Sequence, residues 1–289
     1  MKVLVTGLDG FTGWYLHSEL KRSDCTVVGL QSDLTDCDSV FKEVASIKPD
    51  AVIHLAGISF VGHKDVNEFY KVNLIGTRNL LAALEPFADK LHGVLLISSA
   101  NVYGNQSECL LKESWNLDPA NDYAVSKLSM EQMARLWMNR LPVFIARPFN
   151  YTGIGQDDKF IVPKLVHHFK HKMDVIELGN MDVYREFGDV RGVAKAYAKL
   201  LNSAPVGNVY NVCTSKAYSL EQVIGLFESI TGHNINIHVN KKYVRDNEVK
   251  YLAGDNERLN QLIGNWQDYS LEDTLEWMLY GAKELANSS

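Results

Sequence analysis

The chain has 289 residues, of which 46% are hydrophobic, and its formal net charge is −6. This hydrophobic content is enough for one large α/β unit or two smaller lobes. Lysine and arginine form no runs, which argues against nucleic acid and anionic membranes as partners. No apolar run is long enough to span a bilayer, and the N-terminus, MKVLVTG, shows no leader pattern. The four cysteines form no CxxC pair, so we expect no metal site, no disulfide framework and a reducing cytoplasmic location.

The first half of the chain alternates short apolar strands with helices. This alternation predicts an α/β fold with a doubly wound parallel sheet, as in Rossmann domains. The predicted strands are 2–6, 26–30, 49–56, 93–99 and 142–147. The predicted helices are 11–21, 36–46, 65–84 and 121–139.

The alternation loosens after residue 148, and residues 149–159 have the composition of a loop. Ser219 and Gln222 match a capping box, and Ser270 is expected to cap the last helix. We expect a dinucleotide-binding domain over residues 1–148, to which 189–213 return, and a smaller C-terminal α/β lobe built from 149–188 and 214–289. The other predicted helices are 161–172, 189–201, 219–231 and 270–283, and the other predicted strands are 175–178, 185–187, 208–213 and 234–239.

A glycine-rich turn, TGLDGFTG, follows the first predicted strand directly and contains Gly7, Gly10 and Gly13. Glycine lets the backbone approach a ligand, and the next helix offers free N–H groups and a positive dipole end to a pyrophosphate. The spacing is GxxGxxG and differs from the GxGxxG fingerprint, so the position between strand and helix carries the prediction.

The end of the second predicted strand bears on the choice of cofactor. NAD-dependent enzymes usually place an acid there to bind the ribose hydroxyls. This chain has Gln31, which would not repel a 2′-phosphate, and we therefore favour NADP(H) slightly over NAD(H). Asp33 and Leu34 are expected to hold the adenine edge.

Tyr123 and Lys127 are four residues apart in YAVSK on a predicted helix, which puts both on one face. A lysine ammonium favours the phenolate and is expected to lower the pKa of Tyr123 toward neutrality. Such a tyrosine exchanges a proton with a carbinol oxygen during hydride transfer. Ser99 ends the fourth strand, where ligands bind in such folds, and is expected to hydrogen-bond the substrate oxygen.

The segments GLDGFTG, HLAG, SSANVYG, YAVSK and RPFN occur in the order seen in extended short-chain dehydrogenases/reductases, and the chain resembles that family. The resemblance implies a Ser99, Tyr123 and Lys127 triad, with Asn73 supporting the lysine through a proton relay. It also implies a cofactor site made by Gly7, Gly10, Phe11, Thr12, Gly13, Gln31, Asp33, Leu34, Leu55, Ala56, Gly57, Asn73, Tyr123, Lys127 and Arg147.

The second half of the chain resembles the GDP-4-keto-6-deoxy-D-mannose reductases, which make GDP-D-rhamnose. The likeness implies that Ser99, Asn101, Asn150, Arg185 and Arg245 bind the nucleotide sugar, and a guanidinium forks two donors onto phosphate oxygens. In YTGIGQ the chain departs from relatives that have a His and a Pro, which leaves the sugar pocket open.

Two other departures separate the chain from related sugar-modifying enzymes. Sugar 4,6-dehydratases carry an acid pair where this chain has Ala100 and Asn101. GDP-fucose synthases carry a cysteine where this chain has Asn101, so dehydration and 3,5-epimerisation both lack their acid–base groups.

We therefore predict an NAD(P)H-dependent 4-keto reductase of a nucleotide-linked 6-deoxyhexose, with Tyr123 as general acid. The alternatives are a nucleotide-sugar 4-epimerase with retained NAD, a reductase of a CDP- or dTDP-linked sugar, and a non-catalytic NAD(P)-binding sensor. The resemblance also implies a homodimer formed through helices 65–84 and 121–139.

Overall fold

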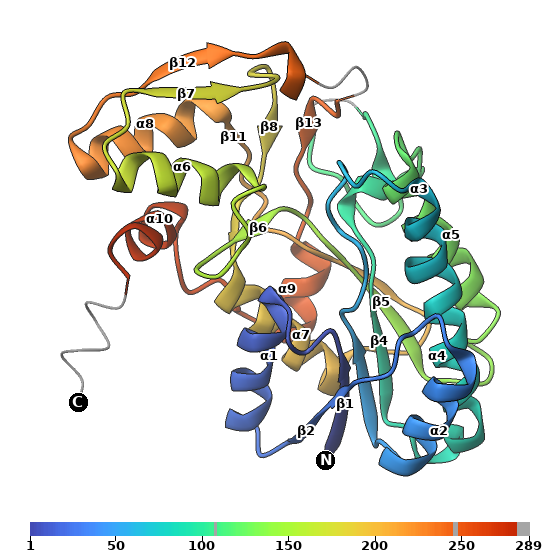
Figure 1. Ribbon diagram of the computed structural model, residues 1–289. Helices are drawn as coiled ribbons and strands as arrows, with labels where there is room; N and C mark the ends of the chain where they lie inside the picture. The colour runs from blue at the N-terminus through green and yellow to red at the C-terminus, as the bar shows by residue number, and fades with distance from the viewer. Residues whose placement is uncertain (107–108, 245–247, 282–289) are drawn as a thin grey trace.

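The computed structural model describes residues 1–106, 109–244 and 248–281. Six parallel strands form the main sheet in the order β10-β5-β4-β3-β1-β2, with helices on both faces (Figure 1). This arrangement confirms the predicted doubly wound parallel sheet. The strands are β1 (Lys2–Thr6), β2 (Thr26–Leu30), β3 (Ala51–His54), β4 (Gly93–Ile97), β5 (Val143–Pro148) and β10 (Val209–Val212).

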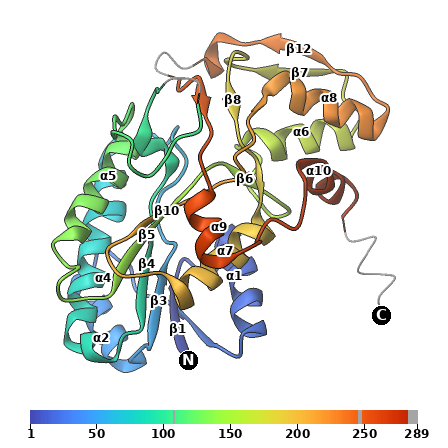
Figure 2. The same ribbon diagram turned by 180° about the vertical axis from the view of Figure 1, so that it is seen from behind.

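The central strands are mostly apolar because helices cover both faces of the sheet. Every residue of β3, β4 and β5 is buried. One face packs on α1 (Phe11–Arg22), α7 (Val190–Ser203) and α9 (Glu257–Ile263), the last seen best from behind (Figure 2). The other face packs on α2 (Cys37–Ile47), α4 (Thr77–Leu84) and α5 (Asp122–Arg135). Residues 189–213 contribute α7 and β10 to this main unit.

The prediction of one continuous α-helix over residues 65–84 is wrong, because the segment changes its helix type. The structure has a short helix α3 (Val66–Glu68), a π-helical segment η1 (Phe69–Gly76) and then α4. One local and two tertiary contacts hold the wider turn: the Thr77 hydroxyl donates to the Asn73 carbonyl at 2.7 Å, and the Asn73 side chain bonds to Ser126 and Ile58. Sequence periodicity does not reveal such a segment, and π-helical turns are frequent at functional sites.

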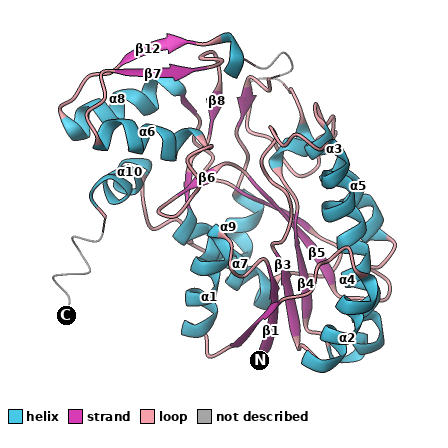
Figure 3. Ribbon diagram, viewed as in Figure 1, coloured by secondary structure: helices cyan, strands magenta, loops and turns pink. Residues whose placement is uncertain are grey.

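A second lobe lies beyond the carboxyl ends of the main sheet (Figures 1 and 3). Its own apolar core joins three helices to small sheets, and both predicted caps, at Ser219 and Ser270, are present as capping boxes. Of the predicted strand 185–187, only Arg185 lies in a strand, β8 (Tyr184–Arg185), while β6 (Tyr151–Thr152) lies inside the predicted loop and α9 was not predicted. The lobe contains α6 (Ile161–Lys170), α8 (Leu220–Thr231), α10 (Leu271–Tyr280), β7 (Val175–Leu178), β8 (Tyr184–Arg185), β11 (Tyr218–Ser219), β12 (Asn236–Val239) and β13 (Tyr251–Leu252). The remaining short elements are β6 (Tyr151–Thr152), β9 (Gly188–Asp189), η2 (Glu85–Lys90), η3 (Ala100–Tyr103) and η4 (Lys241–Tyr243).

Candidate active site

The glycine-rich turn joins β1 to α1 at the carboxyl edge of the sheet. Gly7 has a φ of +69°, and a Cβ there would lie 3.0 Å from the backbone nitrogen of Ala56. A Cβ on Gly13 would overlap the carbonyl oxygens of Gly7 and Leu8. Gly10 is the N-cap of α1 and supplies no side-chain cap, so the first N–H groups of the helix are free for an anion. The turn therefore fits the pyrophosphate of a dinucleotide.

Tyr151 connects the glycine-rich turn to the segment that leads into the second lobe. Its hydroxyl lies 2.8 Å from the Thr12 hydroxyl, and its ring stacks on Phe11 with centroids 6.1 Å apart. Sequence analysis treated this stretch only as a departure from relatives. Its place directly after RPFN was the available signal, because that motif ends a strand of the sheet.

At the end of β2, residues of the following segment form hydrogen bonds with Glu43 of α2 and with one another. The backbone N–H of Gln31 donates to the carboxylate of Glu43 from α2, at 2.9 Å. Asp33 accepts hydrogen bonds from the N–H and the hydroxyl of Thr35, both at 2.8 Å, and these bonds lower its pKa. Leu34 is buried. An acid therefore stands at this strand end although the strand itself provides none.

The groups of the triad meet above the sheet. Tyr123 and Lys127 lie on α5, and each is 6% exposed, while Ser99 ends the segment after β4 and is 5% exposed. Burial raises the pKa of Tyr123 to about 12, although a hydrogen bond with the Ser99 side chain opposes the shift. Burial also lowers the pKa of Lys127 to about 8. The expected neutral pKa of Tyr123 is thus wrong for this structure, because the Lys127 ammonium donates to the Ile97 carbonyl at 2.8 Å and desolvation dominates at the phenol.

Asn73, Gly57 and Lys127 approach one another closely. A Cβ on Gly57 would lie 2.8 Å from the Asn73 side-chain oxygen and 3.2 Å from the Lys127 nitrogen. The Asn73 amide also accepts from the Ile58 N–H at 2.9 Å and donates to the Ser126 hydroxyl at 3.0 Å. The π-helical segment η1 therefore delivers Asn73 to the lysine of the triad. Leu55 and Ala56, which the sequence analysis assigned to the cofactor, directly precede this Gly57.

A buried histidine, His54, connects the end of β1 to the start of α4 by hydrogen bonds. Thr77 donates its only hydroxyl proton to the Asn73 carbonyl, so the 2.8 Å bond between Thr77 and His54 Nε2 must be donated by the histidine. His54 Nδ1 then accepts from Thr6 at 2.6 Å, and Thr6 accepts from the Ala56 N–H at 3.1 Å. Burial lowers the pKa of His54 to about 3, which keeps it neutral. This side chain stands in the HLAG motif, but no pattern in the sequence distinguishes it from its neighbours.

Arg147 has a role different from the expected cofactor contact. Its guanidinium forms a bidentate ion pair with Glu131 at 2.9 and 2.7 Å and donates to the Tyr103 hydroxyl at 3.0 Å. Glu131 also accepts from the Ser98 hydroxyl at 2.5 Å. The pair is buried beneath the carboxyl ends of β4 and β5, so it holds the strand that precedes Ser99. Glu131 comes four residues after Lys127, a spacing that marks the same helix face.

The residues expected to bind substrate lie in separate surroundings in the structure. Asn101 lies beside Ser99, with its amide nitrogen 3.1 Å from the serine hydroxyl. Asn150 is exposed, and its carbonyl accepts from Gly188. Arg185 pairs with Glu248 at 2.8 Å and donates to the Val249 carbonyl. Arg245 lies outside the described residues.

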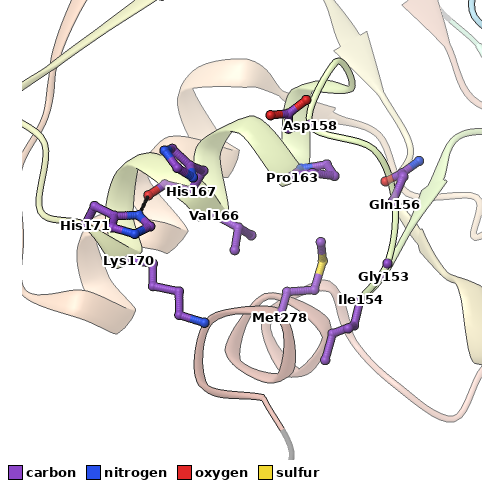
Figure 4. Close-up of a pocket in the computed structure, with 11 residues that line it drawn as sticks. Gly153, Ile154, Gln156, Asp158, Pro163, Val166, His167, Lys170, His171 and Met278 are labelled. Carbon is purple, nitrogen blue, oxygen red and sulfur yellow. Dashed lines mark hydrogen bonds between the residues drawn. The ribbon is translucent and has the colours of Figure 1, made fainter.

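A cavity of about 440 Å³ lies between α6 and α10 (Figure 4). His167, Lys170 and His171 line it but are exposed; His167 and Lys170 lie in the last turn of α6, and His171 is its C-cap. Gln156 connects it to the β6 segment through Thr152, at 2.7 Å. The triad residues do not line this cavity.

Two negative findings apply to residues 1–106, 109–244 and 248–281. Within them no group of three or more His, Cys, Asp and Glu side chains is placed to hold a metal ion. In the same ranges no helix is long and apolar enough to cross a membrane.

Known sequences resemble the chain over nearly its whole length. A profile of the NAD dependent epimerase/dehydratase family matches residues 3–213. The chain is 36% identical over 270 residues to a GDP-6-deoxy-D-talose 4-dehydrogenase of Aggregatibacter actinomycetemcomitans, covering 92% of each protein. It is 33% identical over 294 residues to a GDP-6-deoxy-D-mannose reductase of Pseudomonas aeruginosa, covering 96% of each.

Solved structures share the fold as well. A putative epimerase from Burkholderia cenocepacia J2315 superposes with a TM-score of 0.89 at 43% identity, covering 96% of each chain. The RMD protein of Pseudomonas aeruginosa, complexed with NADPH, superposes with a TM-score of 0.87 at 33% identity. That match covers 96% of this chain and 97% of the other.

Proposed function

The chain belongs to the NAD dependent epimerase/dehydratase family, and we propose that it reduces the keto group at carbon 4 of a GDP-linked 6-deoxyhexose, GDP-4-keto-6-deoxy-D-mannose. The observation that carries the proposal is the composition of the site. Tyr123 and Lys127 lie on α5, and Tyr123 shares a hydrogen bond with Ser99, while Ala100 and Asn101 stand where sugar 4,6-dehydratases and GDP-fucose synthases carry their acid–base groups. Both curated relatives named above act, by name, on GDP-linked 6-deoxyhexoses.

The protonation states of the site fit reduction. When bound, the nicotinamide cofactor supplies the hydride for carbon 4. Tyr123, with its pKa raised to about 12 by burial, is a neutral phenol at physiological pH and donates its proton to the developing alkoxide. Ser99 hydrogen-bonds the same oxygen and orients it toward the phenol. Lys127, which lies near Asn73, would hold the cofactor ribose. General acid catalysis of this kind contributes roughly 10²–10⁴-fold.

The cofactor is a nicotinamide dinucleotide whose pyrophosphate would be held by the turn containing Gly7, Gly10 and Gly13, with Thr12 beside it. Gln31 taken alone favours NADP(H), as sequence analysis expected. Glu43 opposes that preference, because it brings a carboxylate to the same strand end.

The second lobe would hold the nucleotide sugar, with Asn101 closest to the reacting oxygen and Asn150 at the entrance to the lobe. The rest of the proposal is that the enzyme works in the cytoplasm as a homodimer. Residues 65–84 and 121–139 would form the interface, and Ile75 and Leu136 on their exposed sides would supply apolar surface.

The test is the loss of NADPH or NADH absorbance with GDP-, CDP- and dTDP-4-keto-6-deoxyhexoses, with Tyr123→Phe as the control. Stoichiometric oxidation with the GDP sugar, lost in the variant, is the expected result. Identification of the product by NMR then assigns the configuration at carbon 4, which distinguishes a mannose from a talose product. Interconversion of a nucleotide sugar without net cofactor consumption would instead establish a 4-epimerase with retained NAD. Binding without turnover would leave only a sensor.

A further inference from the structure

The carboxylate of Glu43 occupies the end of β2, although the residue belongs to α2. One oxygen accepts the N–H of Gln31 at 2.9 Å. The other accepts the N–H of Ser32 at 2.7 Å and the Ser32 hydroxyl at 2.5 Å. Burial raises the pKa of Glu43, but the hydrogen bonds from Ser32 and Gln31 outweigh it and leave the pKa below its usual value. The side chain is therefore a carboxylate at neutral pH.

This strand end lies beside the phosphate-binding turn. β1 and β2 are paired in register, with Thr6 opposite Leu30, so Gly7 and Gln31 follow at the same edge. The contact is close, because a Cβ on Gly29 would lie 3.0 Å from the Leu8 side chain in the turn. In dinucleotide-binding folds the adenosine ribose lies at this place, and an acid here binds its hydroxyls.

The backbone N–H groups of Gln31 and Ser32 and the Ser32 hydroxyl, which could receive a 2′-phosphate, already donate to Glu43. A phosphate at this position needs N–H groups, hydroxyls or cations. Among the described residues, no lysine or arginine forms an ion pair with Glu43. A 2′-phosphate would therefore meet a negative charge and no free donor in this group.

We propose that Glu43 selects NAD(H) over NADP(H), by engaging the donors of Gln31 and Ser32 and by repelling a 2′-phosphate. Helix α2 thus provides the acid that β2 itself lacks, which reverses the preference expected from Gln31 alone. The inference rests on the proposed function only in that the chain binds a nicotinamide dinucleotide.

The test is equilibrium titration of the full-length protein with NADH and with NADPH, without a sugar substrate, followed by calorimetry or nicotinamide fluorescence. We expect the wild type to bind NADH more tightly. Glu43→Gln keeps the shape of the side chain and removes its charge, and should strengthen NADPH binding about tenfold while changing NADH binding by less than about threefold. Glu221→Gln, an exposed residue on α8, makes the same change in net charge and should leave both affinities unchanged.

The salt dependence provides a second readout that a merely structural role would not move. Discrimination against NADPH in the wild type should weaken as salt screens the two charges, and Glu43→Gln should show less of this dependence. An unchanged ratio of the two affinities in Glu43→Gln, or an equal loss of both, would overturn the proposal. Tighter binding of NADPH by the wild type would overturn it as well. A shifted ratio in a protein that does not reduce the 4-keto sugars would support the role of Glu43 and reject the proposed reaction.

Discussion

The buried ion pair between Arg147 and Glu131 allows a sharp prediction about stability. Glu131→Gln keeps the volume of the side chain but leaves the guanidinium buried without a countercharge. Arg147 is 2% exposed and Glu131 is not exposed at all. Breaking such a pair by removing one partner costs about 3–5 kcal/mol, which is a large share of the roughly 5–15 kcal/mol that stabilises a typical protein.

The chain offers a matched control in the pair between Arg140 and Glu85. Both pairs have a 2.7 Å contact between nitrogen and oxygen, but the side chains of Arg140 and Glu85 are 47% and 40% exposed. Glu85→Gln is therefore expected to cost about 0–1 kcal/mol, because solvent screens the charges. The two pairs share this contact distance but differ in burial, and only the buried pair is bidentate.

The assay is equilibrium unfolding in urea at neutral pH for both variants and for Glu131→Gln combined with Arg147→Met. The double variant should be more stable than Glu131→Gln alone, since it removes the uncompensated charge. Similar free energies of unfolding for Glu131→Gln and Glu85→Gln would refute the reasoning. Glu131→Gln also removes the negative charge that raises the pKa of Lys127 against the effect of burial, so the pKa of Lys127 should fall below about 8.

Three further predictions follow from the site. Gly13→Ala should abolish measurable dinucleotide binding in a titration while the protein stays folded by circular dichroism, because its methyl group would overlap the Gly7 and Leu8 carbonyls; retained affinity would contradict the placement of the pyrophosphate. Tyr151→Phe removes the hydroxyl that bonds to the glycine-rich turn and should weaken cofactor binding by roughly 1 kcal/mol, about fivefold, with kcat nearly unchanged in steady-state kinetics; a large loss of kcat would instead place the hydroxyl in the chemistry. His54 has a pKa of about 3 in the folded state and about 6.5 in the unfolded state, so the unfolded state binds more protons between these pH values. Acidification through this range should therefore lower the free energy of unfolding by about 1.4 kcal/mol per pH unit. In His54→Gln this contribution should be absent from urea unfolding measured at several pH values, and parallel stability curves for the two proteins would count against a neutral histidine.

The arrangement of the main sheet was predictable because its signals are local. The apolar runs at residues 2–6 and 93–97 show no alternation, which is the pattern of a strand covered on both faces. The glycine triplet lies directly between a strand and a helix, so its proximity to the sheet edge follows from chain connectivity. Tyr123 and Lys127 share a face because the helical repeat places residues four apart together.

Other features depend on contacts between segments distant in the chain. The π-helical turn at Asn73 requires partners at Ile58 and Ser126, and no periodicity within residues 65–84 reports them. The second lobe was harder to divide into elements because strands such as β6 and β9 are two residues long and exist only through their pairing. A two-residue strand has no side-chain pattern of its own.

The sequence by itself determined the fold class, and it predicted the phosphate-binding turn and the triad from short motifs of residues near one another in the chain. Only the tertiary structure decided what the charged side chains do. Arg147 was expected at the cofactor and forms a buried ion pair with Glu131, and burial raises the pKa of the Tyr123 phenol to about 12 where the sequence predicted a lowered pKa. The Glu43 carboxylate binds the end of strand β2 from helix α2. The energy of a charge depends on its desolvation and on every partner within a few ångströms, and both are set by the packed fold.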